Sequence, residues 1–317
     1  MNRYLFLCCA VVTLVVVMVS PITGARNLNG FDLSNITVPI AHVVHGGPPK
    51  DGIPAVLSPN YVQGEAASFM RDDDIVLGFA LKGQFFAYPR YIMNWHELVN
   101  DQVNGEAFLI TYCPLCGSGV AFLAQVDGKN LMFGVSGLVM NSDVLFYDKN
   151  TESLWSQLDQ ISISGDYAGT KLEALYLEHT TWKRWLKLHP TTKVLSENQG
   201  KKRPYRRDPY TGYDSSSRLY FKVLRKAPKT YHSKERVMGV QVGDKSKAYP
   251  FIELRKFGQT VFEDQLGGTR FKVLWDADSE TATIVGLDGQ AMVSTQVFWF
   301  AWYAFHFDTQ VFKARDF

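Results

Sequence analysis

Two stretches of the sequence, 161 residues apart, share one pattern, and this internal repeat constrains the fold more than any other feature. Residues 76–89 read Val-Leu-Gly-Phe, a glycine-centred turn and Phe-Ala-Tyr-Pro, while residues 237–250 read Val-Met-Gly-Val, a similar turn and Lys-Ala-Tyr-Pro. The match continues at an offset of 163, which relates Asn-Asp-Gln at 100–102 to Glu-Asp-Gln at 263–265. Because the matches occur in the same order in both stretches, we infer two copies of one supersecondary unit.

The repeated stretch has the pattern of a β-hairpin, a helix and a strand. Residues 74–88 are rich in apolar and β-branched side chains around a turn at Lys82-Gly83, as in a hairpin. Pro89 suits the first turn of a helix, which we expect to run to about Asn100. A strand over 107–112 follows. The sequence therefore predicts an α+β fold dominated by strands and built on an internally duplicated β-hairpin–helix–strand unit.

The first 25 residues have the features of a secretory signal peptide. Arg3 precedes an apolar run, and Thr23-Gly24-Ala25 provides the small residues of a cleavage site. Pro21 and Gly24 argue against a continuous membrane-spanning helix. We therefore expect a signal peptide over 1–25, no membrane span after its cleavage, and a secreted, extracellular protein (periplasmic or cell-surface in a bacterium).

The repeat divides the rest of the chain into four segments. Lys and Arg number 33 against 31 Asp and Glu, a balance that argues against a nucleic-acid partner. An unknown small molecule, or a thiol or disulfide partner, is the expected ligand. The segments are an extended N-terminal arm over 26–60, a first repeat over 61–160, a connecting strand–helix–loop segment over 161–235 and a second repeat over 236–317.

The motif Cys113-Pro-Leu-Cys116 is the clearest chemical signal in the sequence. The other two cysteines lie in the predicted signal peptide, so the mature chain would keep only this pair. An exported C-x-x-C pair can be a redox dithiol, a metal knuckle between two strands, or a structural disulfide between Cys113 and Cys116. A metal site would need further ligands, and zinc or copper would be the ion. The second copy has Asp276 and Ser279 at the corresponding positions, which favours a functional role for the cysteines.

Several other residues could complete a site around the cysteines. His96 and His306 are candidate bases for thiol chemistry, and with Asp143 they are candidate metal ligands. Ser136, Ser142 and Asp143 are expected to line a cleft. Asn35-Ile36-Thr37 is a pattern for N-glycosylation at Asn35.

Several motifs recur together along the chain: Gly46–Ala55, Ala87-Tyr88-Pro89, His96–Asp101, Thr111–Gly117, Phe133–Gly137, Asn141-Ser142-Asp143, Ser153–Gln157 and Trp299–His306. This combination resembles an exported domain-of-unknown-function family, number 3179. The resemblance implies an exported globular protein and supports a site at the cysteines, but it implies no activity. Phe307 departs from the family pattern, in which Pro would follow His306.

Three functional hypotheses follow. The first is thiol–disulfide redox chemistry, in which one cysteine attacks and the other resolves. The second is metal binding through the cysteine pair together with His or Asp. The third is a non-catalytic binding module that uses the aromatic C-terminal segment and a Tyr-rich basic loop over 200–217.

Overall fold

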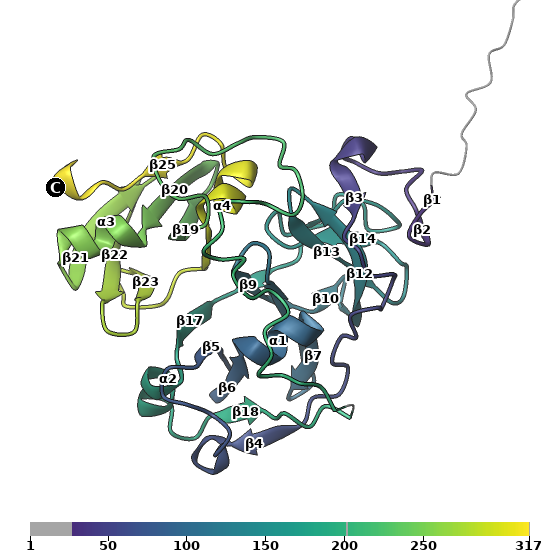
Figure 1. Ribbon diagram of the computed structural model, residues 1–317, viewed down its shortest axis with the longest axis horizontal. Helices are drawn as coiled ribbons and strands as arrows, with labels where there is room; N and C mark the ends of the chain where they lie inside the picture. Colours follow the sequence, from purple (N-terminus) through teal and green to yellow (C-terminus); the bar gives the residue numbers. More distant parts are fainter. Residues whose placement is uncertain (1–26, 201, 317) are drawn as a thin grey trace, which may run out of the picture.

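Strands dominate the protein, which confirms the β-rich class that the sequence predicts. The computed structural model describes residues 27–200 and 202–316, and the predicted signal peptide lies outside them. Within these residues the strands form five sheets of three to five strands (Figure 1). Two ribbons of two strands each join β1 (Asn27–Leu28) to β2 (Phe31–Asp32) and β10 (Gln125–Val126) to β11 (Lys129–Asn130).

The first hairpin lies inside a five-stranded sheet of order β17-β5-β6-β18-β4. β5 (Ile75–Leu81) pairs with β6 (Gln84–Pro89) around the predicted turn. β17 (Leu177–Thr181) is antiparallel to β5, and β18 (Lys193–Leu195) is parallel to β6. β4 (Tyr61–Gln63) forms the edge. Strands from far along the chain therefore complete this sheet.

The second hairpin lies inside a four-stranded sheet with the corresponding plan, of order β24-β19-β20-β25. β19 (Arg236–Val242) pairs with β20 (Lys245–Pro250). β24 (Ser294–Phe298) is antiparallel to β19, and β25 (Gln310–Val311) is parallel to β20. The two sheets thus share the pairing and direction of four strands.

A seven-residue helix and an antiparallel meander follow each hairpin. In the first stretch, α1 (Arg90–His96) leads into β7 (Leu98–Val103), β8 (Glu106–Cys113) and β9 (Ser118–Leu123), and β16 (Ala174–Leu175) pairs with β9. In the second stretch, the same order of elements is α3 (Phe251–Phe257), β21 (Val261–Leu266), β22 (Thr269–Asp276) and β23 (Thr281–Gly286).

The first helix ends earlier than predicted. We expected it to reach about Asn100, but its last residue is His96, and Asn100 lies in β7. Glu97 has a φ of 58°, outside the helical region, and this residue turns the chain from α1 into β7. The apolar residues after Glu97 therefore face a strand partner rather than continuing the helical face.

Two further helices pack a tryptophan on a glycine of each hairpin. α2 (Trp182–Leu188) follows β17, and the side chain of Thr181 caps it by accepting from the Arg184 amide. α4 (Trp299–Phe305) follows β24. A Cβ atom at Gly78 would overlap the ring of Trp185, and one at Gly239 would overlap the ring of Trp302. Both positions therefore require glycine for packing.

An additional sheet is formed mainly by residues between β9 and β17. Its order is β15-β14-β13-β12-β3, so the N-terminal arm contributes one edge strand. This sheet brings the turn between β12 and β13 to the turn between β8 and β9, which lies near the centre of Figure 1. The strands are β12 (Phe133–Met140), β13 (Asp143–Asp148), β14 (Leu154–Ser156), β15 (Ile161–Ser162) and β3 (Val43–His45).

A long connection without helix or strand runs from β18 to β19, over the described residues 196–200 and 202–235. The loop that the sequence predicts over 200–217 lies within it. The connection contacts the β12–β13 turn, where the Ser142 hydroxyl donates to the carbonyl of Phe221 at 2.8 Å. None of the described helices has the length and apolar character needed to cross a membrane.

Candidate metal centre

Both cysteines lie in the tight turn that joins β8 to β9. Cys113 is the last residue of β8, and the Cys116 amide donates to its carbonyl at 3.2 Å. Gly117 continues the turn with a φ of 61°, which suits glycine. Both side chains are buried, and both are free thiols. The disulfide between Cys113 and Cys116, one of the three possibilities that the sequence allowed, is therefore not formed.

The turn between β12 and β13 brings a carboxyl group to the thiols. Asn141 and Ser142 both have positive φ values, 54° and 66°, as in the two-residue turns of tight hairpins. The Ser142 carbonyl accepts from the Cys113 thiol at 3.7 Å and from the Cys116 thiol at 3.4 Å. The next residue is Asp143. One oxygen of its carboxyl and the two sulfurs all lie within 4.8 Å of one another. We call Cys113, Cys116 and Asp143 the Cys–Cys–Asp cluster.

The Asp143 carboxyl is only partly satisfied by hydrogen bonds. Its Oδ2 accepts from the Leu158 amide at 3.0 Å. Its Oδ1 is buried and has no hydrogen-bond partner among the described residues. A buried polar atom without a partner costs free energy, so this oxygen, beside two thiols, is available as a ligand atom.

Burial controls the protonation of this site. It raises the pKa of Asp143 to about 7, and it raises the pKa of both thiols, with Asp143 adding to the effect. Burial and the charge of Asp143 raise the pKa of Glu97 to about 8. After burial, the neighbouring Cys113 thiol and then the Asp143 carboxyl raise the pKa of Cys116, while the carboxyls of Asp143 and Glu97 raise that of Cys113. The site is thus a set of buried acids, and no Lys or Arg of the described residues is among the main influences on their pKa values.

A cavity of about 210 Å³ borders the cluster at Cys113, and Glu97 also lines it. Gly137, with a φ of 73°, lies so close to the carbonyl of Pro48 that a Cβ atom would overlap it. This close approach holds the N-terminal arm against β12. The cavity lining is otherwise apolar and aromatic, and it includes Pro48, Ile53, Leu115, Val135, Leu138, Tyr210 and Phe221. Motifs that are far apart in the sequence thus converge on one cavity.

The two histidines lie outside the cluster. His96 Nδ1 is 2.8 Å from the carbonyl of Pro54, and its Nε2 is 2.7 Å from the hydroxyl of Tyr205. His306 packs on Trp302 with ring centroids 4.0 Å apart, and its Nδ1 lies 3.4 Å from Gln241 Nε2. Neither histidine contributes a ligand atom to the Cys–Cys–Asp cluster.

His306 has a counterpart in the first stretch. His189 packs on Trp185 at a centroid distance of 4.2 Å, as His306 packs on Trp302. The two indole Nε1 atoms each donate to a threonine hydroxyl at 2.9 Å, that of Thr192 or Thr309. The same contacts at the same spacing indicate that His306 belongs to the packing of α4.

Of the residues expected to line a cleft, Ser136, Ser142 and Asp143, none borders the 210 Å³ cavity. The Ser142 carbonyl accepts from both thiols, and Asp143 belongs to the Cys–Cys–Asp cluster. The hydroxyl of Ser136 donates to the carbonyl of Leu145 and accepts from the amide of Leu138 at 3.0 Å. These bonds support the irregularity in β12 between residues 135 and 138.

Glu97 is a site residue that the sequence analysis did not single out. It lies between His96 and the apolar pair that begins β7. A single acidic residue among apolar neighbours could have indicated a buried carboxyl at this position. Its burial depends on the left-handed backbone at the end of α1, which the sequence pattern did not reveal.

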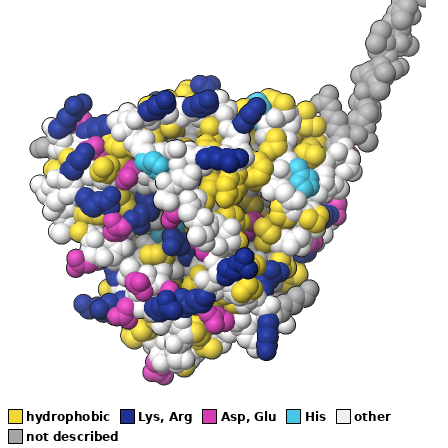
Figure 2. Space-filling model, viewed as in Figure 1, with side chains coloured by type: hydrophobic (Ala, Val, Ile, Leu, Met, Phe, Trp, Pro, Cys, Tyr) yellow, Lys and Arg dark blue, Asp and Glu magenta, His cyan; other side chains and the backbone are white. Residues whose placement is uncertain are grey.

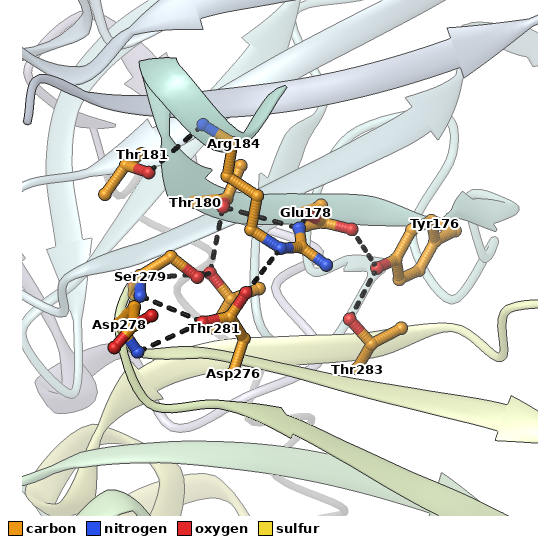
Figure 3. A network of polar contacts seen from close by, with 10 residues as sticks. All are labelled: Tyr176, Glu178, Thr180, Thr181, Arg184, Asp276, Asp278, Ser279, Thr281 and Thr283. Atoms are coloured by element: carbon orange, nitrogen blue, oxygen red, sulfur yellow. Dashed lines mark hydrogen bonds and ion pairs between the residues drawn. The ribbon is translucent and has the colours of Figure 1, made fainter. Parts of the chain in front are cut away.

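The corresponding turn of the second stretch carries a polar network instead of cysteines. The Asp276 carboxylate accepts from Arg184 Nε at 3.1 Å and from the Ser279 amide at 3.1 Å (Figure 3). The Thr281 hydroxyl donates to that of Thr180 at 2.9 Å, which ties β23 to β17. This network joins the two stretches and offers no thiol.

Comparison with known proteins gives a family and no activity. Residues 50–291 match the family described as "Protein of unknown function (DUF3179)". The chain belongs to this family. No curated protein matches, and no solved structure matches. The cysteine turn, the β12–β13 turn and most of the cavity lining lie inside the part of the chain that matches the DUF3179 family.

Proposed function

We propose that the Cys–Cys–Asp cluster binds a metal ion, with zinc as the ion that its ligands suit best. The observation that carries the proposal is the buried Asp143 Oδ1 without a hydrogen-bond partner, in a cluster whose three ligand atoms lie within 4.8 Å of one another. A tetrahedral zinc ion with bonds of about 2.3 Å holds its ligands about 3.8 Å apart, so small side-chain shifts would bring all three ligand atoms to binding distance.

The donor set favours zinc over copper. Thiolates bind both zinc and Cu(I), but a carboxylate oxygen suits zinc and is a poor ligand for Cu(I). A cation would also remove the electrostatic problem of the site, because it stabilises thiolates and a carboxylate that burial otherwise keeps protonated.

Three protein ligands leave the fourth zinc position available. The Ser142 carbonyl lies 3.4 Å from the Cys116 sulfur and is one candidate for it. A small molecule in the 210 Å³ cavity is the other, since the cavity borders Cys113. Glu97 borders the same cavity, and its raised pKa of about 8 suits it to hold a proton near such a molecule at neutral pH.

Thiol–disulfide exchange receives less support from this geometry. An attacking cysteine needs an accessible thiol with a lowered pKa, usually near a cation. Cys113 and Cys116 are exposed by 1% and 0%, and burial raises the pKa of both thiols. Redox chemistry through these cysteines therefore requires the turn to open.

The test is the metal content of the full chain produced by a secreting host. We expect elemental analysis to find one zinc ion per chain. Cobalt substitution should then give the sulfur-to-metal absorption of a thiolate site. Cys113→Ser, Cys116→Ser and Asp143→Asn should each lower metal content, whereas Asp159→Asn, a nearby carboxyl outside the cluster, should retain it.

A metal-free protein with normal folding would overturn the proposal. Thiol titration under denaturing conditions then separates the alternatives. Two free thiols without any metal would show that the cluster binds no ion, and an oxidised pair would support the redox hypothesis. Stoichiometric copper would keep the site and change the ion.

We also propose that the two stretches are copies of one unit and that the protein is exported. The recurring strand order and the paired Trp–Gly contacts support the first proposal. For the second, N-terminal sequencing of the secreted chain should begin at residue 26. Asn35, the predicted glycosylation site, is exposed. Its side-chain Nδ2 donates to the Gly165 carbonyl at 2.9 Å, and its Oδ1 accepts from the Gly165 backbone amide at 2.9 Å.

A further inference from the structure

A second, larger cavity lies along the long connection between β18 and β19. It is a groove of about 670 Å³ between residues 217–233 and the start of α4. Its volume falls within the range of small-molecule sites, about 300–1,000 Å³. Tyr220 and Phe221 border both this groove and the smaller cavity beside Cys113.

The walls of the groove are aromatic and apolar. Trp299 and Phe300 from α4 face Phe221 and Tyr231 of the connection. The indole Nε1 of Trp299 already donates to the carbonyl of Pro228 at 3.1 Å, so its ring offers an apolar surface rather than a free donor. An occupant of this groove therefore needs an apolar body.

The charge around the groove has one sign. Lys222, Lys226 and Lys229 are exposed and contribute to its lining, and no Asp or Glu does. Across residues 27–200 and 202–316, none of these three ammonium groups has an ion-pair partner. On the face drawn in Figure 2, hydrophobic side chains gather in the upper central part with Lys and Arg side chains around them.

From this combination we infer that the groove binds a free amphipathic carboxylate, a small molecule with an apolar chain and one anionic head. The aromatic walls would hold the chain, and the three lysines would attract and pair with the head. The inference is independent of the metal proposal, because it uses neither the thiols nor Asp143.

Titration calorimetry with dodecanoate below its micelle concentration tests the inference on the full chain. We expect saturable binding of one dodecanoate per chain, accompanied by a change in tryptophan fluorescence. Dodecyltrimethylammonium, which has the same chain and the opposite charge, should bind at least about tenfold more weakly.

Two variants locate the site. Lys226→Glu combined with Lys229→Glu should weaken dodecanoate binding by about tenfold or more, while Lys129→Glu on β11, which does not line the groove, should not change it. Ala227→Trp should fill the groove and abolish binding. Circular dichroism and urea denaturation of each variant show whether it has folded.

Equal affinity for the cationic and anionic amphiphiles would overturn the assignment of an anionic ligand. Unchanged binding in a folded Ala227→Trp variant would place the ligand elsewhere and overturn the site. Absence of any dodecanoate binding to the folded wild-type chain would refute the inference, and none of these results bears on the metal content.

Discussion

Replacing Asp143 with Asn should stabilise the metal-free protein at pH 8, although it removes a residue of the proposed site. Burial raises the pKa of this carboxyl from 3.8 to about 7. Between those values the unfolded chain releases the proton while the folded chain retains it, so wild-type stability falls as the pH rises. About three pH units at about 1.36 kcal/mol each give a loss of about 4 kcal/mol above pH 7.

The Asp143→Asn variant has no proton to lose at this position, and its amide oxygen can still accept from the Leu158 amide. Urea denaturation of both metal-free proteins from pH 4.5 to 8 measures the effect. The stability of the variant relative to the wild type should increase as the pH rises, and this difference should become constant above about pH 7. A difference larger than about 4 kcal/mol would come in part from Glu97, because the charge of Asp143 helps to raise the pKa of Glu97.

Two results would refute this reasoning. A stability difference that does not depend on pH would show that Asp143 is ionised in the folded state, and the exposed control Asp166→Asn fixes the baseline for such a comparison. Failure of zinc to stabilise the wild type more than the variant at pH 8 would separate Asp143 from metal binding. Zinc bound only to the folded state must add stability by mass action.

Two further predictions concern the packing of the hairpin sheets. Gly78→Ala and Gly239→Ala should each lower the midpoint of urea denaturation and cost about 1–3 kcal/mol or more, because the added Cβ overlaps the ring of Trp185 or Trp302; an unchanged midpoint would mean that the indole moves freely. His306→Ala should lower thermal stability through the lost contact with Trp302 while metal content stays at the wild-type value; a loss of metal in a folded His306→Ala protein would return this histidine to the site.

The sequence predicted the class of the fold because strand patterns are local. The hairpins at 75–89 and 236–250 each combine a short apolar pattern with a glycine turn, and the hydrogen-bonded pairs follow directly from it. The end of α1 could not be predicted in the same way. Glu97 has a backbone conformation that its residue type rarely adopts, and only the packing of β7 against β8 fixes it.

The equivalence of the two aromatic helices was present in the sequence and was missed. Trp182, Trp185 and His189 have the same spacing as Trp299, Trp302 and His306. The residues between them differ, so the match is visible only as spacing. Recognising it would have assigned His306 to helix packing, as the contacts of His189 and His306 now do.

The cysteine pair was predicted as a special turn, but its third partner could be named only as one candidate among several. Asp143 reaches the thiols because β12 and β13 form a hairpin whose tip meets the β8–β9 turn. That meeting is a long-range contact between two sheets, and residue spacing carries no information about it. The two positive φ values at the tip place the Ser142 carbonyl against the sulfurs.

The position of the additional sheet explains why only one stretch carries the cluster. In the first stretch, residues 124–176 lie between β9 and β17 and include β12 and β13, which provide Ser142 and Asp143. In the second, residues 287–293 alone join β23 to β24 and cannot provide such a hairpin. A pair of cysteines at the second turn would therefore lack the carboxyl ligand, and there Asp276 instead pairs with Arg184. The proposed metal site thus depends on the first turn and on the sheet inserted after it, so loss of either should abolish metal binding.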